Sequence, residues 1–235
     1  MAVISIAKKA TIKQKFVNGF AKGIMLPDSY PGVEAYKCAL KAGSRVDPKV
    51  YKNKTQVLFF TKGVGYVGTP NKAHNITEEA VFVPLFDSEK FFIQAGTDLE
   101  FLEILVTLTE ADTKRLGEMR MTLPHFRLLS DCDRYEEAFK GPGVLSYSII
   151  ANRRLARALM GAVIGAGPNF VQEHAHDNLQ QWVYGLTGSA FRFRADGDEV
   201  EMREGDWAHI PPKAKHSVET SAGDKLDYIW FEIVC

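Results

Sequence analysis

The amino-acid sequence predicts an all-β protein that contains one structural unit twice. The first observation is that from residue 33 the chain breaks into runs of five to eight residues rich in valine, isoleucine, phenylalanine and tyrosine. Glycine, proline and aspartate clusters separate these runs, of which Val57–Thr61, Ala80–Pro84 and Phe101–Thr107 are examples. No long stretch has the roughly 3.6-residue periodicity of an amphipathic helix. Strands therefore dominate the predicted structure.

The second observation is a repeat at an offset of 125 to 127 residues. Gly43–Gly63 matches Gly167–Gly188, and Ala95–Leu102 matches Ala222–Ile229, each of these last two leading into a terminal strand. Self-similarity at a fixed offset is the signature of a repeated structural unit. The sequence therefore indicates two similar β domains in tandem.

The repeat divides the chain into an N-terminal domain over residues 1–110, a linker over 111–145 and a C-terminal domain over 146–235. We expect the first thirty residues, which mix lysines with apolar residues, to form short strands or a lead-in arm. The expected linker is the more polar stretch between the two copies. A length of 235 residues suits one large or two small domains.

Composition excludes several classes of partner. Lysine and arginine together equal aspartate and glutamate at 29 each, so no net charge draws the chain to nucleic acid or to an anionic membrane. The cysteines Cys38, Cys132 and Cys235 are few and form no paired motif, which favours a reduced, cytoplasmic setting. We find no secretory signal and no apolar run near the roughly 20 residues needed to span a bilayer. The expected partner is a small-molecule substrate, and the sequence leaves open whether the chain forms a homodimer.

The stretch from residue 167 to 216 carries the candidate chemistry. His174 and His176 lie two residues apart, so on a strand both imidazoles point to the same side. Gln181 follows five residues later, and His216 ends a second β-rich segment. Four donors can therefore converge on one ion.

These residues resemble the two motifs of the cupin family. In the first motif a His-x-His pair is followed by an acidic residue, six residues and a glycine, and Gly188 keeps that spacing. In the second motif a glycine, five residues, a proline, four residues and a histidine follow one another, as Gly205 and Pro211 do before His216. Two departures are a glutamine, Gln181, at the usual glutamate position and Lys213 at a glycine position.

The resemblance implies a bicupin, with two tandem jelly-roll barrels of the double-stranded β-helix type. It also implies one divalent transition metal, Zn, Mn, Ni or Fe, in the C-terminal barrel. The implied ligands are His174, His176, Gln181 and His216. Gln180 competes with Gln181 for the fourth position, and a three-histidine site completed by water, with Gln181 nearby as a hydrogen-bond donor, is the alternative.

A neutral glutamine ligand leaves the full charge on the ion, which favours Lewis-acid chemistry. By resemblance, this ligand set is similar to that of non-redox cupins. We therefore expect a lyase, isomerase, cyclase or hydrolase that acts on a small anionic or sugar-like substrate. The alternatives are an iron or manganese dioxygenase and a small-molecule-binding cupin that is not an enzyme. The sequence assigns no catalytic acid or base.

In the first copy the ligand positions hold Lys49, Tyr51 and Glu89, with Gln56 opposite Gln181. An ammonium and a phenol must lose a proton before they can bind a metal, so we expect this metal motif to be degenerate. The preferred interpretation is a structural half that packs on or dimerises with the catalytic half. The alternative is a metal-free pocket lined by these four side chains.

Strand alternation predicts the walls of the second cup. Phe191 and Phe193 share one face of their strand, and Val183 shares the face of Gln181, so these three are expected to line the pocket. In the last strand the face with Ile229, Phe231 and Ile233 is purely apolar and is the expected inner face. Glu232 would then lie at the surface. His209 is expected to point away from the metal ligands.

Overall fold

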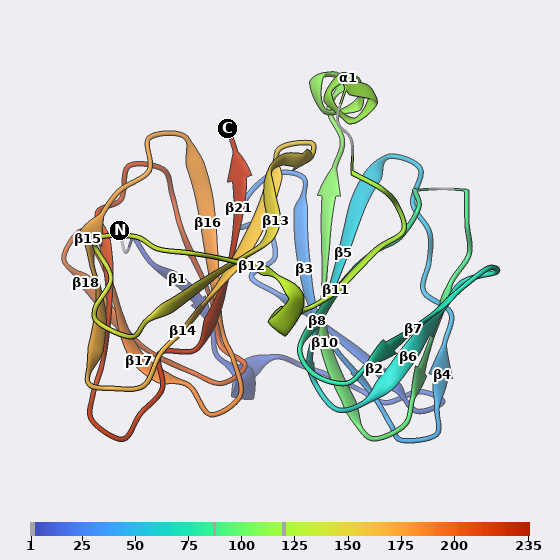
Figure 1. The fold of residues 1–235 in the computed structure, drawn as a ribbon, viewed down its shortest axis with the longest axis horizontal. Helices are drawn as coiled ribbons and strands as arrows, with labels where there is room; N and C mark the ends of the chain where they lie inside the picture. The colour runs from blue at the N-terminus through green and yellow to red at the C-terminus, as the bar shows by residue number, and fades with distance from the viewer. Residues whose placement is uncertain (1–2, 87, 119–120) are drawn as a thin grey trace. The chain divides into compact units, whose positions relative to one another are not determined.

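The computed structural model describes residues 3–86, 88–118 and 121–235, and Figure 1 labels their helices and strands. The chain forms two compact units. One contains Ile12–Cys132, and the other combines Asp133–Cys235 with the described residues up to Thr11. Every pairing between named strands in both units is antiparallel. The expectation of an all-β chain built from two barrels is confirmed.

The first barrel, within Ile12–Cys132, consists of two sheets among the described residues. The larger sheet has the order β11 (His125–Leu128), β8 (Ala80–Val83), β5 (Lys54–Lys62), β10 (Leu99–Thr107), β3 (Val33–Leu40) and β2 (Phe20–Met25). The smaller sheet has the order β4 (Arg45–Val46), β9 (Phe92–Ala95), β6 (Gly65–Gly68) and β7 (Ala73–Ile76). Short helical segments are η1 (Lys9–Thr11), α1 (Glu110–Glu118) and η2 (Leu129–Asp131), of which the first belongs to the other unit.

The second barrel has the same two-sheet construction among the described residues. Its larger sheet has the order β1 (Ser5–Ala7), β19 (Trp207–Ile210), β16 (Leu179–Gly185), β21 (Tyr228–Val234), β14 (Ala158–Ile164), β13 (Leu145–Leu155) and β12 (Asp133–Tyr135). Its smaller sheet has the order β15 (Asn169–His174), β20 (His216–Thr220), β17 (Ala190–Ala195) and β18 (Asp198–Arg203). The two sheets enclose the core.

The N-terminal segment departs from the expected boundaries. β1 pairs with β19 and so extends the larger sheet of the second barrel, as the blue strand in Figure 1 shows. The buried carboxylate of Asp206 holds this arm, because it accepts a hydrogen bond from the backbone N–H of Lys9 at 2.8 Å and pairs with Lys8 at 3.1 Å. The arm therefore leads into the first barrel only after it has contributed a strand to the second.

The stretch 111–145, expected to be a linker, is divided between the two barrels. β11 pairs with β8 of the first barrel, and β12 pairs with β13 of the second. The division falls between Cys132 and Asp133. Polar composition did not indicate these strands because both are edge strands, on which polar side chains are common.

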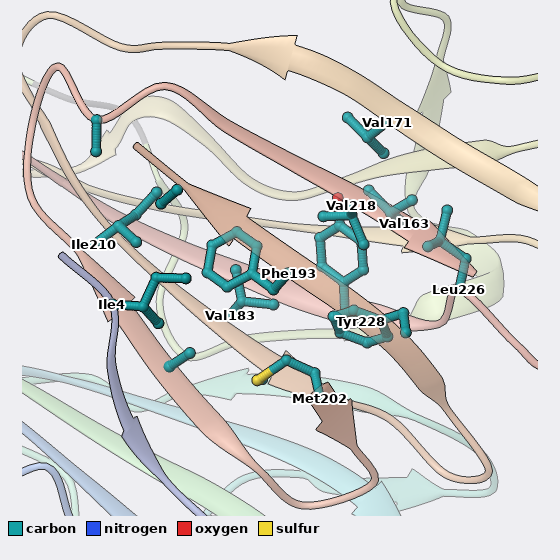
Figure 2. Close-up of a cluster of buried hydrophobic side chains, with 14 residues drawn as sticks. Ile4, Val163, Val171, Val183, Phe193, Met202, Ile210, Val218, Leu226 and Tyr228 are labelled. Atoms are coloured by element: carbon teal, nitrogen blue, oxygen red, sulfur yellow. The ribbon is translucent and has the colours of Figure 1, made fainter. Parts of the chain in front are cut away.

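Alternating burial along the strands builds the core of the second barrel. In β17 every second residue is buried, so Phe191 and Phe193 face inward while Arg192 and Arg194 face outward. Figure 2 shows Phe193 among the inward side chains of the neighbouring strands, including Val183 and Val218. Valine and phenylalanine suit such pleated inner faces because they pack well on a sheet. Phe193, Val183 and Val218 also form walls of the candidate site.

Candidate metal centre

The structure brings the three predicted histidines together. β15 ends at His174, β20 begins at His216, and these two residues are Cα partners in the smaller sheet. His176 lies in the loop between β15 and β16. The ring centroids of His174 and His216 are 4.2 Å apart, and the centroid of His176 lies 5.1 and 5.4 Å from them. One nitrogen from each ring lies within 4.8 Å of the others.

Backbone carbonyls orient two of these rings. The Nδ1 of His174 lies 2.8 Å from the Gln172 carbonyl oxygen, and the Nδ1 of His216 lies 3.0 Å from that of Ala214. Because a carbonyl can only accept, each Nδ1 carries the proton and each Nε2 keeps its lone pair. The buried Nε2 of His216 has no hydrogen-bond partner among the described residues. This tautomer is the one that presents Nε2 to a metal ion.

Burial keeps the imidazoles of His176 and His216 neutral. Desolvation lowers the pKa of His216 to about 4, and desolvation, followed by the nearby His174, lowers the pKa of His176. Both rings are therefore unprotonated near neutral pH. Metal ligation requires this form, so no proton has to be displaced before an ion binds.

Gln181 joins the histidines from the larger sheet. It lies in β16, only 6% exposed, and borders the same cavity as the three histidines. Its Oε1 is buried without a hydrogen-bond partner among the described residues. Gln180 points to the other face of the strand, where its Oε1 lies 2.8 Å from Nε2 of His209. The geometry therefore favours Gln181 over Gln180 and places His209 away from the cluster.

The cavity around these donors is small and largely walled by apolar side chains. Its volume is about 140 Å³, below the roughly 300–1,000 Å³ of sites for drug-sized ligands. Val183 and Phe193 line it as predicted. Phe191 faces the barrel interior but packs on Tyr228, with ring centroids 5.4 Å apart, and does not border the cavity. Further apolar wall residues are Val163, Val171, Val218, Phe139 and Trp230.

The expected position of Glu232 is wrong. Its side chain borders the cavity and is 5% exposed, and its Oε1 lies 3.8 Å from Nε2 of His176. Burial, followed by repulsion from Glu137, raises its pKa to about 8. The apolar face with Phe231 is also fully buried, and the Phe231 ring contacts Trp182 with centroids 5.8 Å apart. Since both faces of β21 are buried, apolar character did not identify the inner one.

Sequence reasoning also missed the segment that borders the cavity from outside the repeat. Tyr135, Glu137, Phe139 and Lys140 come from the stretch expected to be a linker. The Phe139 ring lies 4.5 Å from that of His174. The Lys140 ammonium contacts the Glu137 carboxylate and donates to Ser146 Oγ at 2.6 Å. Aromatic and charged residues mixed in this stretch were the available signal, but no spacing rule placed them at the cup.

The corresponding positions of the first barrel hold a different set of groups. Lys49 and Tyr51 border a cavity there, and Gln56 is buried beside it. Glu89 borders an adjoining hollow that Lys49 also reaches. Among the described residues, the cluster of histidines in the second barrel is the one group of three or more such side chains that could hold a metal ion.

Comparisons with known proteins agree with this architecture. Residues 162–234 match the model of the cupin domain. A putative glyoxylate-induced protein from Pseudomonas aeruginosa has a similar structure, with a TM-score of 0.76 and 13% identity over 100% of this chain and 89% of that one. An oxalate decarboxylase of Lactobacillus farciminis, in a formate complex, gives a TM-score of 0.75 and 12% identity over 97% and 86%.

A third similar structure is a mutant of Bacillus subtilis oxalate decarboxylase, with a TM-score of 0.73 and 13% identity over 96% of this chain and 76% of that one. Such identities show the fold alone. A search of curated proteins by sequence finds no match. In the described part of the chain, no helix is long and apolar enough to cross a membrane. Residues 162–234 are thus a cupin domain, and the chain as a whole has the fold of a tandem cupin protein.

Proposed function

We propose that the second barrel is a metal-dependent, non-redox enzyme site for a small anionic substrate. The observation that carries the proposal is the meeting of three imidazoles and a buried acidic side chain in one cavity. His174, His176 and His216 supply the imidazoles, and Glu232 lies 3.8 Å from His176. The reaction class is that of a lyase, isomerase, cyclase or hydrolase.

The donor set fits a divalent transition metal. Two buried atoms, His216 Nε2 and Gln181 Oε1, lack partners among the described residues, and an unsatisfied buried polar atom is costly. A metal ion would satisfy both. With His174 and His176 the set offers three nitrogens and one neutral oxygen, which suits Zn, Mn, Ni or Fe. When bound, the ion supplies a Lewis acid whose charge no ligand in this set cancels.

The cavity limits the substrate. A volume of about 140 Å³ admits a molecule of few heavy atoms, and the valine and phenylalanine walls exclude water from its apolar parts. Lys140 lies at the border of the cavity with a side chain only 6% exposed. The Glu137 carboxylate balances the Lys140 ammonium at the border of the cavity, so the uncancelled charge of the metal ion is what favours an anion. A small carboxylic acid is therefore the expected substrate class.

Glu232 is the proposed proton carrier. A carboxyl group whose pKa is raised to about 8 by burial holds a proton near neutral pH, and a bound dication would lower that pKa. The group is thus suited to give and take a proton within the cavity. Burial also raises the pKa of the Tyr228 hydroxyl well above its usual range, so this side chain stays protonated and can only orient.

The similar structures suggest a metal and a substrate for the first assays. Oxalate decarboxylases share the fold, and the Bacillus subtilis enzyme has Mn(II) centres. Oxalate and manganese are therefore the first substrate and metal to test. An oxygen-dependent reaction would need O₂, whereas the proposed Lewis-acid chemistry would proceed equally in its absence. A cupin that only binds its ligand would show no turnover, with or without oxygen.

The test begins with the metal content of the purified full chain, measured by mass spectrometry after supply of Zn, Mn, Ni or Fe. About one ion per chain is expected in the wild type and in Lys49→Ala, and none in His176→Ala. Turnover of oxalate, malonate and other small carboxylates is then compared with and without oxygen. Glu232→Gln is expected to keep the metal and lose about 10²-fold or more in turnover.

Three results would contradict the proposal. Loss of metal from Lys49→Ala together with retention in His176→Ala would place the ion elsewhere. Loss of metal from Glu232→Gln would make Glu232 a ligand and not a proton carrier. Turnover that stops when oxygen is removed would favour the dioxygenase alternative.

A further inference from the structure

The first barrel contains a cup of its own, separate from the candidate metal centre. Its volume is about 130 Å³. Its lining combines apolar side chains with charged and hydroxyl groups. The apolar residues at its border are Phe20, Val46, Leu58 and Phe101, and the polar ones include Lys22, Lys49, Tyr51 and Glu103.

The acidic group in this cup is already neutralised. The Glu103 carboxylate, 6% exposed, lies 2.5 Å from the Lys22 ammonium. It also accepts a hydrogen bond of 2.6 Å from Nε2 of Gln56, whose amide group donates as well to the Lys49 carbonyl at 3.3 Å. Both partners of the amide are acceptors, so its orientation is fixed. The Lys22 and Glu103 charges therefore cancel within the barrel.

Lys49 and Tyr51 have no such compensation. In the described ranges the Lys49 ammonium has no carboxylate partner, and it lies over the Tyr51 ring, 5.1 Å from its centroid. The Tyr51 hydroxyl makes no hydrogen bond with these residues. Asp47 also borders the cup, but its carboxylate is bound by the Arg45 guanidinium at 2.7 and 3.2 Å. One uncompensated positive charge and one free hydroxyl donor therefore remain.

We propose that this cup is a metal-free binding site for a small monocarboxylate with a short apolar body. The carboxylate would lie between the Lys49 ammonium and the Tyr51 hydroxyl, both of which donate hydrogen bonds to oxygen. The apolar body would contact the apolar side chains that line the cup, Phe20, Leu58 and Phe101. A hollow of about 460 Å³ adjoins the cup and shares Asp47, Pro48 and Lys49 with it.

The choice of ligand follows from charge and size. A dianion would bring one charge more than the cup can balance, and a cation would meet the Lys49 ammonium directly. A metal ion finds no cluster of histidine, cysteine and acidic ligands among the described residues of this barrel. The cup thus selects by charge complementarity, where the second barrel is proposed to select by metal coordination.

The experiment measures binding of acetate, butyrate and benzoate to the full chain by calorimetry after treatment with a chelator. Removing the metal should abolish the metal-dependent carboxylate binding proposed for the second barrel, and His176→Ala serves as a check on that barrel. Variants of the cup are Lys49→Met and Tyr51→Phe. Lys52→Met is the matched control, because Lys52 is an exposed lysine three residues along the same segment.

The expected result is binding of about one butyrate or benzoate per chain, with acetate weaker because it lacks the apolar body. Lys49→Met is expected to weaken butyrate binding at least about tenfold, since it removes a charge-assisted hydrogen bond. Tyr51→Phe should weaken it by a smaller factor, and Lys52→Met and His176→Ala should leave it unchanged. Equal affinities in Lys49→Met and Lys52→Met, or no binding of any of the three acids at about 10 mM, would overturn the proposal.

Discussion

Replacing Glu232 by glutamine is expected to stabilise the metal-free second barrel, and to do so only at higher pH. The carboxyl group has a usual pKa of 4.5, which burial raises to about 8 in the folded protein. At pH 7 the unfolded chain holds this group ionised and the folded chain holds it protonated. A difference of one pKa unit corresponds to about 1.36 kcal/mol. At pH 7 the group ionises in the unfolded chain, where its pKa of 4.5 lies below the pH, and this lowers the stability of the folded protein by about 3 kcal/mol. Glutamine carries no such cost.

The sign of the pH dependence follows from proton counting. Between pH 4.5 and about 8 the folded state binds more protons at Glu232 than the unfolded state does, so the free energy of unfolding falls as the pH rises. Below pH 4.5 both states are protonated and Glu232→Gln should change little. The stability gain of the variant should therefore grow from near zero at pH 4.5 to about 3 kcal/mol at pH 7.

The assay is denaturant unfolding at pH 5, 6, 7 and 8 after removal of metal. All three tryptophans of the chain, Trp182, Trp207 and Trp230, lie in the second barrel, so their fluorescence reports its unfolding alone. Glu173→Gln, at an exposed position, is the matched control and should change stability by less than about 0.5 kcal/mol.

Two results would refute this reasoning. Wild type and Glu232→Gln could lose stability in parallel as the pH rises, which would show that Glu232 is ionised in the folded metal-free protein. The variant could also be less stable than wild type at pH 8, which would show that the carboxyl group makes essential contacts. Saturating Zn²⁺ should flatten the wild-type dependence, because a nearby dication favours the ionised carboxylate.

Three further predictions concern the second barrel. Gln181→Glu should bind metal at least as tightly but bind malonate more weakly by calorimetry, because a carboxylate cancels one charge of the ion; equal malonate affinities at full metal occupancy would contradict it. Lys140→Met should weaken malonate binding about tenfold, because it leaves the Glu137 carboxylate unpaired at the cavity border, and an unchanged affinity would exclude this role. Asp206→Ala should lower the free energy of unfolding by about 2–4 kcal/mol, because it removes the acceptor for the backbone N–H groups of Lys9 and Arg203. Tryptophan fluorescence measures this loss, and a loss below about 0.5 kcal/mol would show that the arm is held by other contacts.

The metal motif was predictable because its information is local. The short spacing between His174 and His176 keeps both rings at the end of β15, although His176 lies just beyond that strand, and the glycine and proline spacings indicate where the chain turns. His174, His176 and His216 could therefore be placed together without knowing the rest of the barrel. The interior position of Val183 and Phe193 followed from strand alternation, and the structure agrees with it.

Non-local features could not be predicted in this way. The pairing of β1 with β19 joins residues about two hundred positions apart, and nothing in Ser5–Ala7 specifies that partner. The position of Glu232 depended on which face of β21 is the inner one, and both faces are buried. The role of the segment around Lys140 depended on a strand, β12, too short and too polar to be recognised. In each case the sequence of the segment did not specify which strand pairs with it or which residues pack against it.

Gln181 and Glu232 place an amide and a carboxyl group on neighbouring strands, with the amide at the position where a cupin most often has its glutamate ligand. They are directly opposed Cα partners on β16 and β21, so their side chains leave the sheet on the same face. A cupin site with glutamate at the position of Gln181 would use its carboxylate on the metal, which lowers both the charge of the ion and the basicity of the acid. Here the amide takes that position, and the carboxyl group stands one strand away, 3.8 Å from Nε2 of His176. The ion would then keep its charge for an anionic substrate, while the acid stays free to exchange a proton.

Swapping the two residues, as Gln181→Glu with Glu232→Gln, preserves the composition and net charge of the cavity. If metal affinity rises while turnover is lost, the position of the carboxylate, and not its presence, determines the chemistry of the site.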